Sequence, residues 1–170
     1  MNALLQPAPG PLTHRPMTVA DLDAVLAIEV AAYSHPWTRG NFIDSLAAGY
    51  RAELRLDDAG HLVGYCIALP GFEETHLLNL SVAPARQRAG HGWALLQRLA
   101  DEARQRGDHA LWLEVRQSND GARALYRRAG FVEVGLRRGY YPAARLARED
   151  AVVMRLALDP LAPEGDDALV

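Results

Sequence analysis

A short glycine-containing segment, Gln87-Arg-Ala-Gly-His-Gly92, constrains the fold of this 170-residue chain most strongly. It follows an apolar run that ends at Val82 and precedes a segment in which leucines recur at helical spacing from Leu95, so it predicts a strand–turn–helix unit. Glycine lets the backbone approach a ligand closely, and the first amides of a helix have no internal partners. Because the helix dipole is positive at that end, the unit suits an anion such as a pyrophosphate. On these six residues alone, a tight turn without a ligand stays open.

Two nucleotide-binding motifs with glycine turns do not fit this segment. A P-loop needs Gly-Lys followed by Ser or Thr, and the segment contains no lysine. A dinucleotide fingerprint needs a third glycine three places after Gly92, where the chain has Leu95. The segment therefore indicates an anion site whose ligand the turn does not identify.

The residues around this unit alternate between strand and helix patterns. Predicted strands cover residues 12–17, 51–56, 62–69, 75–82, 110–116, 131–138 and 151–157, and predicted helices begin at Thr18 and Thr38 and cover 90–106 and 118–129. The apolar stripes of the first two helices include Val30 and Ile43, which we expect to face inward. Alternating strands and helices in the second half predict a parallel crossover, and the hairpins predict antiparallel pairs. The expected fold is a mixed α/β sheet.

Length and composition favour one globular domain, which we place at residues 12–158. Apolar residues make up 49% of the chain, enough for one core. The segments 1–11 and 159–170 are expected to be flexible tails, because one is rich in Pro and Gly and the other is acidic and interrupted by Pro. Cys66 is the only cysteine, so an intramolecular disulfide is impossible, and we expect a buried strand residue rather than a zinc ligand or a reactive thiol.

Charge and hydropathy give expectations about partners. The formal net charge is -3 and the arginines are spread from Arg15 to Arg155, so direct nucleic-acid binding, which needs a basic stripe, is not expected. No apolar run approaches the roughly 20 residues that a membrane span needs, and residues 1–11 lack the pattern of a signal peptide. We therefore expect a cytoplasmic protein without a membrane partner.

Two side chains that could do chemistry follow the glycine turn. Glu114 alternates with Trp112 and Arg116 on one face of a predicted strand, where a structural ion pair with Arg116 is the simplest interpretation. Tyr126 lies on the apolar stripe of the next helix, where core packing explains a tyrosine at least as well as catalysis does. Asn119 caps that helix, either itself or behind the preceding serine. None of these residues identifies a reaction by itself.

Taken together, these features resemble the GNAT superfamily of N-acetyltransferases. The superfamily's cofactor signature, Gln/Arg-x-x-Gly-x-Gly/Ala, is matched by Gln87, Gly90 and Gly92. Over about residues 13–158 the chain is more closely similar to the bacterial ribosomal-protein-alanine N-acetyltransferases, the RimI family. That closer resemblance is carried by Pro36-Trp37-Thr38, Asn79-Leu-Ser-Val82, Leu113-Glu-Val-Arg-Gln-Ser-Asn119, Ala124-Leu-Tyr126, Gly130-Phe131, Arg138-Gly-Tyr-Tyr-Pro142 and Arg148-Glu-Asp-Ala151.

The resemblance implies a fold, a cosubstrate and roles for individual residues. The implied fold is the acyl-CoA N-acyltransferase fold, a mixed sheet of six to seven strands flanked by about four helices, with acetyl-CoA as cosubstrate and no metal. Glu114 is implied as the general base and Tyr126 as the general acid. The implied cofactor contacts are Leu80, Ser81, Val82, Gln87, Arg88, Ala89, Gly90, His91, Gly92, Trp93 and Asn119. His91 and the pair Asp120-Gly121 depart from the family's common residues but replace no matched functional position.

The chemistry of the acceptor favours an α-amine. An amine attacks a thioester only when it is neutral, and an α-amine with a pKa of about 7.7–8.0 is neutral far more often near pH 7 than a lysine at about 10.4. The family's acceptor is the N-terminal alanine of small-subunit ribosomal protein eighteen, so the resemblance implies the N-terminal peptide of a ribosomal protein as partner. Candidates to line a peptide groove are Trp37, Trp112, Tyr140 and Tyr141, although core packing explains them equally well.

Two other functions stay open from the sequence. One is acetylation of a small amine or of a lysine side chain by the same chemistry, and the other is a non-catalytic module that binds acyl-CoA. The intact pair Glu114 and Tyr126 argues against the binding module, and the Tyr140-Tyr-Pro142 block favours a peptide acceptor over a small amine. The expected oligomeric state is a monomer.

Overall fold

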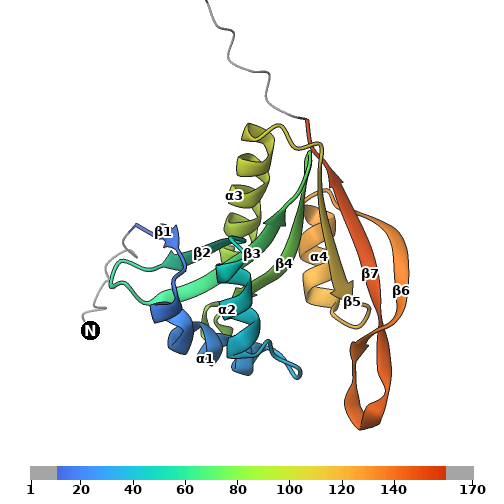
Figure 1. The fold of residues 1–170 in the computed structure, drawn as a ribbon, viewed down its shortest axis with the longest axis horizontal. Coiled ribbons are helices and arrows are strands. Elements are labelled where there is room, and N and C mark those ends of the chain that lie inside the picture. Colours follow the sequence, from blue (N-terminus) through green and yellow to red (C-terminus); the bar gives the residue numbers. More distant parts are fainter. Residues whose placement is uncertain (1–10, 160–170) are drawn as a thin grey trace, which may run out of the picture.

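The computed structural model describes residues 11–159, so the predicted tails 1–11 and 159–170 lie almost entirely outside the described residues. Within this range one seven-stranded sheet has the order β1-β2-β3-β4-β5-β7-β6 (Figure 1). The strands are β1 (Thr13–Pro16), β2 (Arg51–Leu56), β3 (Leu62–Pro70), β4 (Glu74–Val82), β5 (Ala110–Arg116), β6 (Val132–Pro142) and β7 (Arg148–Ala157), and the α-helices of the described region are α1 (Leu22–Ala32), α2 (Arg39–Ala47), α3 (His91–Gln105) and α4 (Asp120–Arg128). The predicted mixed sheet with seven strands and four helices is confirmed.

The strands β4 and β5 form the predicted parallel pair, joined by α3, but they pair over only part of their length. The parallel register runs from Glu74 opposite Ala110 to Leu77 opposite Leu113. Beyond Leu77, β4 stays paired with β3 as far as Val82, while β5 continues along β7. Figure 1 shows the two strands meeting at the upper end of the sheet and separating below it. One edge of β4 is therefore left without a strand partner.

A β-bulge marks the point at which β4 leaves β5. The register between β3 and β4 shifts between Leu77 and Asn79, so Leu78 is an extra residue on β4. A bulge bends its strand and changes which side chains face each side of the sheet. After it, Asn79 and Ser81 turn towards α1: the Asn79 amide donates to the Glu29 carboxylate at 3.1 Å, and the Ser81 hydroxyl lies 2.8 Å from that of Tyr33. Beyond the bulge, side chains of β4 are therefore hydrogen-bonded to the α1 region.

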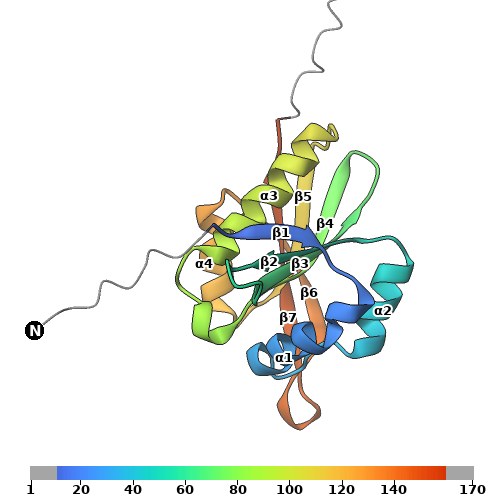
Figure 2. The ribbon, with the colours of Figure 1, turned by 90° about the vertical axis from the view of Figure 1, so that its left-hand side faces the viewer.

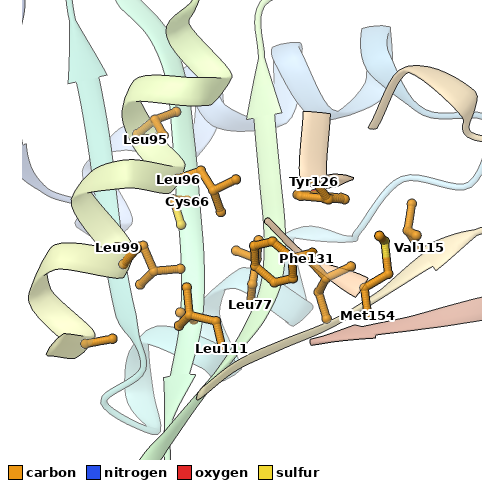
Figure 3. Close-up of a cluster of buried hydrophobic side chains, with 14 of the residues drawn as sticks. Cys66, Leu77, Leu95, Leu96, Leu99, Leu111, Val115, Tyr126, Phe131 and Met154 are labelled. Atoms are coloured by element: carbon orange, nitrogen blue, oxygen red, sulfur yellow. The ribbon is translucent and has the colours of Figure 1, made fainter. Parts of the chain in front are cut away.

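The apolar core consists of two clusters on opposite faces of the sheet. One cluster lies under α3 and α4 and includes Leu96, Leu113 and Tyr126 (Figure 3). The other lies under α1 and α2 and includes Phe42 and Tyr65. Figure 2 shows α3 above the strands and α1 and α2 together below them. Because side chains alternate along a strand, residues of β5 that flank Leu113 face the side of α1 and α2.

Several local predictions can be compared with this structure. Cys66 is fully buried, as predicted, and burial raises the pKa of its thiol to about 12. The predicted inward positions of Val30 and Ile43 are wrong, since these residues are 63% and 39% exposed. The helices turn Glu29 and Ser45 inward instead, and both are hydrogen-bonded there, which offsets the cost of burying polar groups.

Candidate active site

A cavity of about 730 Å³ opens where β4 separates from β5, between the end of β4, the N-terminus of α3 and α4. We call it the β4–α4 cavity. Of the cofactor contacts implied by resemblance, all except Ala89 line it: Leu80, Ser81, Val82, Gln87, Arg88, Gly90, His91, Gly92, Trp93 and Asn119. Its lining also contains Arg86 and Arg128 and no acidic side chain. The cavity therefore suits an anionic ligand, although the role of each residue stays a prediction.

The glycine turn forms the phosphate-sized end of this cavity. Within residues 11–159, the amides from Arg88 to Trp93 donate to no other protein group, and the first amide bonded back to the turn is that of Ala94, to the Gly90 carbonyl at 3.0 Å. Gly90 has a φ of 83°, a left-handed conformation that favours glycine. Free amides at a helix N-terminus bind anions, so this end of the cavity can hold a phosphate group.

The second glycine of the turn serves a different purpose. A Cβ atom at Gly92 would lie 3.3 Å from the Leu125 side chain of α4 and 3.8 Å from Val82. Gly92 therefore lets α3 and α4 approach each other, and its φ is not in the left-handed region. Glycine is thus favoured at the two positions for different reasons: at Gly90 by the backbone conformation, and at Gly92 by the close packing of α3 against α4.

The positive charge around the turn comes from arginines rather than from His91. Burial lowers the pKa of His91, and the nearby guanidinium groups of Arg55 and Arg86 lower it further. The His91 Nδ1 accepts a hydrogen bond from Arg55 Nε at 3.1 Å. Farther along the cavity, the Arg128 guanidinium lies 4.6 Å from the centre of the Trp93 ring. Arginine stays charged over the whole physiological range, so the cavity keeps its attraction for anions.

Tyr126 belongs both to the core and to the cavity. Its ring packs against Phe131 at 5.6 Å in the core under α3 and α4, and the residue also lines the β4–α4 cavity. Burial raises the pKa of its hydroxyl far above the usual range, and the neighbouring Tyr33, Cys66 and Tyr141 raise it further. Tyr126 is therefore protonated at neutral pH and can donate a proton or a hydrogen bond there. Core packing and a donor role are compatible.

Glu114 lies on the other face of the sheet and is not among the residues that line the cavity. Its Oε1 accepts from Arg137 Nη1 at 3.0 Å, and its Oε2 lies 2.5 Å from His76 Nε2. These partners lower the pKa of Glu114, with His76 the larger cause and burial opposing both. The expected ion pair with Arg116 is wrong, because Arg116 bonds to Glu149 at 3.0 Å. Glu114 is an ionised carboxylate at neutral pH.

The four aromatic candidates for a peptide groove lie on different elements of the described chain. Trp37 lines a shallow second hollow of about 520 Å³ beside α2, together with Tyr50 and Leu78. Trp112 lies on the Glu114 side of β5, and its indole donates to Glu74 at 2.9 Å. The rings of Tyr140 and Tyr141 pack edge to face at 4.9 Å, and Arg137 and Arg116 cover one ring each. All four lie at the surface or partly buried.

Three residues near these groups escaped sequence reasoning. Tyr33 lines the cavity, and its hydroxyl lies 3.0 Å from the Leu80 carbonyl on β4. His76 and Arg137 hold Glu114 from β4 and β6. Strand alternation could have placed His76 on a face of β4. Its contact with Glu114, however, depends on how β4 and β5 pair, because the two residues are 38 positions apart in the chain.

Two further features, a metal site and a membrane-spanning helix, are not found in residues 11–159. In this range no three His, Cys, Asp or Glu side chains lie close enough together to hold a metal ion. None of its helices is long and apolar enough to cross a membrane.

Comparison with known proteins connects these features. The profile of the Acetyltransferase (GNAT) family matches residues 22–131. The ribosomal-protein-bS18-alanine N-acetyltransferase of Escherichia coli K12 is 39% identical over 142 residues, which are 84% of this chain and 95% of the relative. The crystal structure of the S18-alanine N-acetyltransferase from Escherichia coli has a TM-score of 0.81 and 37% identity, over 91% of this chain and 98% of that one. A Salmonella typhimurium protein solved with its cofactor acetyl-CoA shares the fold, with a TM-score of 0.71, 24% identity and coverage of 89% and 96%.

Proposed function

The chain belongs to the acetyltransferase (GNAT) family, and from this premise we propose that it transfers an acetyl group from acetyl-CoA to the α-amine of a protein N-terminus. The proposed acceptor is the N-terminal alanine of ribosomal protein bS18, for which the relatives are named. One observation carries the proposal: the β4–α4 cavity brings free helix amides, arginines, a strand edge without a strand partner and the side chain of Tyr126 together. Such a combination fits a long, phosphate-bearing thioester.

The residues of the cavity fit acetyl-CoA from end to end. Acetyl-CoA supplies an acetyl thioester on an amide-containing arm that ends in a pyrophosphate and a nucleotide. The amides from Arg88 to Trp93 would hold the pyrophosphate, with Arg86 and Arg88 as counter-charges. The backbone from Leu80 to Val82 has no strand partner on the side of β5 and would bond there to the amides of the arm, with the Leu80 carbonyl shared with Tyr33. Asn119, which caps α4 with its side-chain oxygen at 3.2 Å from Ala122 N, keeps its amide hydrogens for a contact farther along.

Glu114 and Tyr126 have protonation states that suit the roles of base and acid. Glu114 is ionised at neutral pH and would receive the proton of the acceptor amine, directly or through water. Positioned acids and bases typically contribute about 10²–10⁴-fold. Tyr126 is protonated and would donate to the sulfur of the leaving thiolate. Cys66 is buried with a raised thiol pKa and suits no nucleophilic role, so direct attack by the amine needs no enzyme-bound acyl group.

The free edge of β4 would also stabilise the transition state. A backbone N–H on that edge could donate to the thioester carbonyl oxygen as negative charge develops there, as in an oxyanion hole. Most of the acceleration would come from holding the amine and the thioester together. The bulge at Leu78 and the hydrogen bonds of Tyr33 to β4 support the edge in its separated position.

The acceptor peptide would approach on the side of the sheet that carries Glu114. The hollow beside Trp37 and the paired rings of Tyr140 and Tyr141 offer apolar surface there, and aromatic side chains provide contact area with little loss of side-chain entropy. A ribosomal protein meets acetyl-CoA in the cytoplasm, which is where we place the reaction. The absence of direct nucleic-acid contact and the monomeric state stay predictions.

An assay of CoA release tests the proposal. The full chain would be given acetyl-CoA and a panel of peptides that begin with Ala, Ser or Met, a peptide with an internal lysine and a blocked N-terminus, and polyamines. We expect turnover with the Ala-starting peptide to exceed that with the lysine peptide, because the α-amine is more often neutral. Turnover of a polyamine but of no peptide would instead indicate a small-amine enzyme. Tight binding of CoA without turnover of any acceptor would contradict the catalytic proposal altogether.

A further inference from the structure

The contact between His76 and Glu114 has no place in the roles given so far. His76 lies on β4 opposite Trp112 of β5, so it shares a sheet face with Glu114, two residues farther along β5. The imidazole Nε2 lies 2.5 Å from the Glu114 Oε2. This pairing joins the two strands at the point from which they separate.

Only one of the two side chains that hold Glu114 can exchange a proton. Arg137 occupies Oε1, and a guanidinium group has no acceptor and does not lose its proton in proteins. His76 occupies Oε2, and an imidazole, unlike a guanidinium group, has a second ring nitrogen that can accept a proton. The Glu114 side chain is 13% exposed, whereas that of His76 is 36% exposed. The imidazole is therefore the more accessible member of the pair.

The hydrogen bond also fixes the tautomer of the imidazole. An ionised carboxylate can only accept, and the pKa of Glu114 is lowered by His76 and Arg137, so Nε2 must carry the hydrogen. The lone pair of a neutral His76 is then on Nδ1, and no group within residues 11–159 bonds to that atom. A carboxylate that fixes the tautomer and the orientation of an imidazole is the arrangement by which many enzymes position a histidine.

We infer that Glu114 and His76 act as a pair, in which His76 takes up the proton that the acceptor amine loses while Glu114 orients the ring and stabilises the imidazolium. The inference rests on the proposed function and refines its base. The acceptor enters as R–NH₃⁺ and gives one proton through water to Nδ1, which leaves the neutral amine to attack. The second proton, which the nitrogen loses as the C–N bond forms and the C–S bond breaks, replaces the one that Tyr126 gives to the thiolate, so the products are the amide, the CoA thiol and one released proton. The net charge of the pair changes from -1 to zero, and Nδ1 then gives the proton to bulk water, so the pair returns to its starting state.

The surroundings of the pair are balanced in charge. On β4 itself Glu74 lies on the same face as His76 and bonds to the Trp112 indole at 2.9 Å. Arg137 of β6 bonds to Glu114, and Arg155 of β7 lies 5.5 Å from the Trp112 ring. The neighbour on β3 is the uncharged Leu69. Two carboxylates thus face two arginines, and no excess positive charge opposes a protonated imidazole.

Two substitutions at His76 separate a proton carrier from a structural partner. His76→Gln keeps an N–H donor that can reach Glu114 but cannot titrate, whereas His76→Ala removes both properties. We expect both variants to lose about tenfold or more in kcat at pH 7 with an Ala-starting peptide. The deficit should shrink as the pH rises past about 8, where the α-amine loses its proton unaided. Full activity of His76→Gln across the pH range would overturn the inference.

Three further measurements distinguish a failure of the inferred pair from a failure of the proposed function. The kcat of Glu114→Gln should fall at least as far as that of His76→Gln. If only Glu114→Gln is impaired, the result contradicts a proton-accepting role for His76 but leaves Glu114 as the base. If neither is impaired, the base of the proposed function fails as well. Added imidazole should restore part of the activity of His76→Ala, and no rescue at any pH would contradict a proton role. The matched control is His109→Gln, a histidine that is 58% exposed beside Glu73 at 3.9 Å and should retain its kcat.

Discussion

The β4–α4 cavity and the face around Glu114 are built from different groups. The anion-binding end of the cavity consists of backbone amides, glycines and arginines, together with His91, whose pKa is lowered. The face around Glu114 consists of a carboxylate, a histidine, arginines and aromatic rings held by side-chain hydrogen bonds. In the proposed function, the first region would bind acetyl-CoA and the second would remove the proton of the amine, so the two tasks would be carried out by different sets of groups.

Tyr126, which lines the cavity and packs in the core, carries the largest expected effect. Tyr126→Phe keeps the ring that packs against Phe131 and removes only the hydroxyl. We expect kcat to fall by about 10²-fold with little change in the KM for acetyl-CoA, as measured by steady-state CoA release, and with the melting temperature nearly unchanged.

Tyr33→Phe is the comparison for this change, because its hydroxyl also belongs to a tyrosine of the cavity but bonds to β4. A smaller loss in kcat is expected there. A larger loss of kcat in Tyr33→Phe than in Tyr126→Phe would assign the role of general acid to Tyr33 instead of Tyr126.

The cavity should be sensitive to backbone conformation at Gly90. Gly90→Ala places a Cβ on a residue with a φ of 83°, and a left-handed conformation costs an ordinary residue roughly 1–2 kcal/mol. If the turn relaxes, its amides move, so the KM for acetyl-CoA should rise about tenfold while the KM for the peptide stays constant. Isothermal titration with CoA gives the same quantity directly.

Gly107→Ala is the matched control, because Gly107 has a φ of 84°, has open space around its Cβ position and follows the far end of α3. It should lower the melting temperature as Gly90→Ala does without weakening CoA binding. Equal weakening in both variants would mean that general strain, rather than the amides of the turn, explains the effect.

The smallest effect is expected at Trp37, on the opposite side from the cavity. Trp37→Ala removes an indole that lines the hollow beside α2 and packs against Phe42 at 5.3 Å. We expect the KM for the peptide to rise by about fivefold, as loss of a peripheral aromatic contact does, with the KM for acetyl-CoA unchanged. Trp37→Phe should retain most of the affinity. A selective effect on acetyl-CoA would show that the hollow does not belong to the acceptor side.

The sequence predicted the parts of the molecule that depend on neighbours along the chain. The strand–turn–helix unit around Gly90 was predictable because its conformation and its free amides are local properties. The burial of Cys66 followed from the apolar run around it. Val30 and Ile43 were misplaced because the helices turn Glu29 and Ser45 to the inside, where Glu29 bonds to groups outside its helix and Ser45 bonds to the Asn41 carbonyl of its own helix. An apolar stripe alone does not reveal such partners.

By itself, the sequence determined the order of strands and helices, the glycine turn, the family and the two residues, Glu114 and Tyr126, that we propose as base and acid. Only the tertiary structure decided how these parts meet. The bulge at Leu78 frees one edge of β4, and the register between β4 and β5 sets His76 against Glu114. The physical reason is that strand register and the pairing of charges depend on contacts between residues far apart in the chain. Alternation within β5 allowed Arg116 as the partner of Glu114, but packing supplied His76 and Arg137 instead.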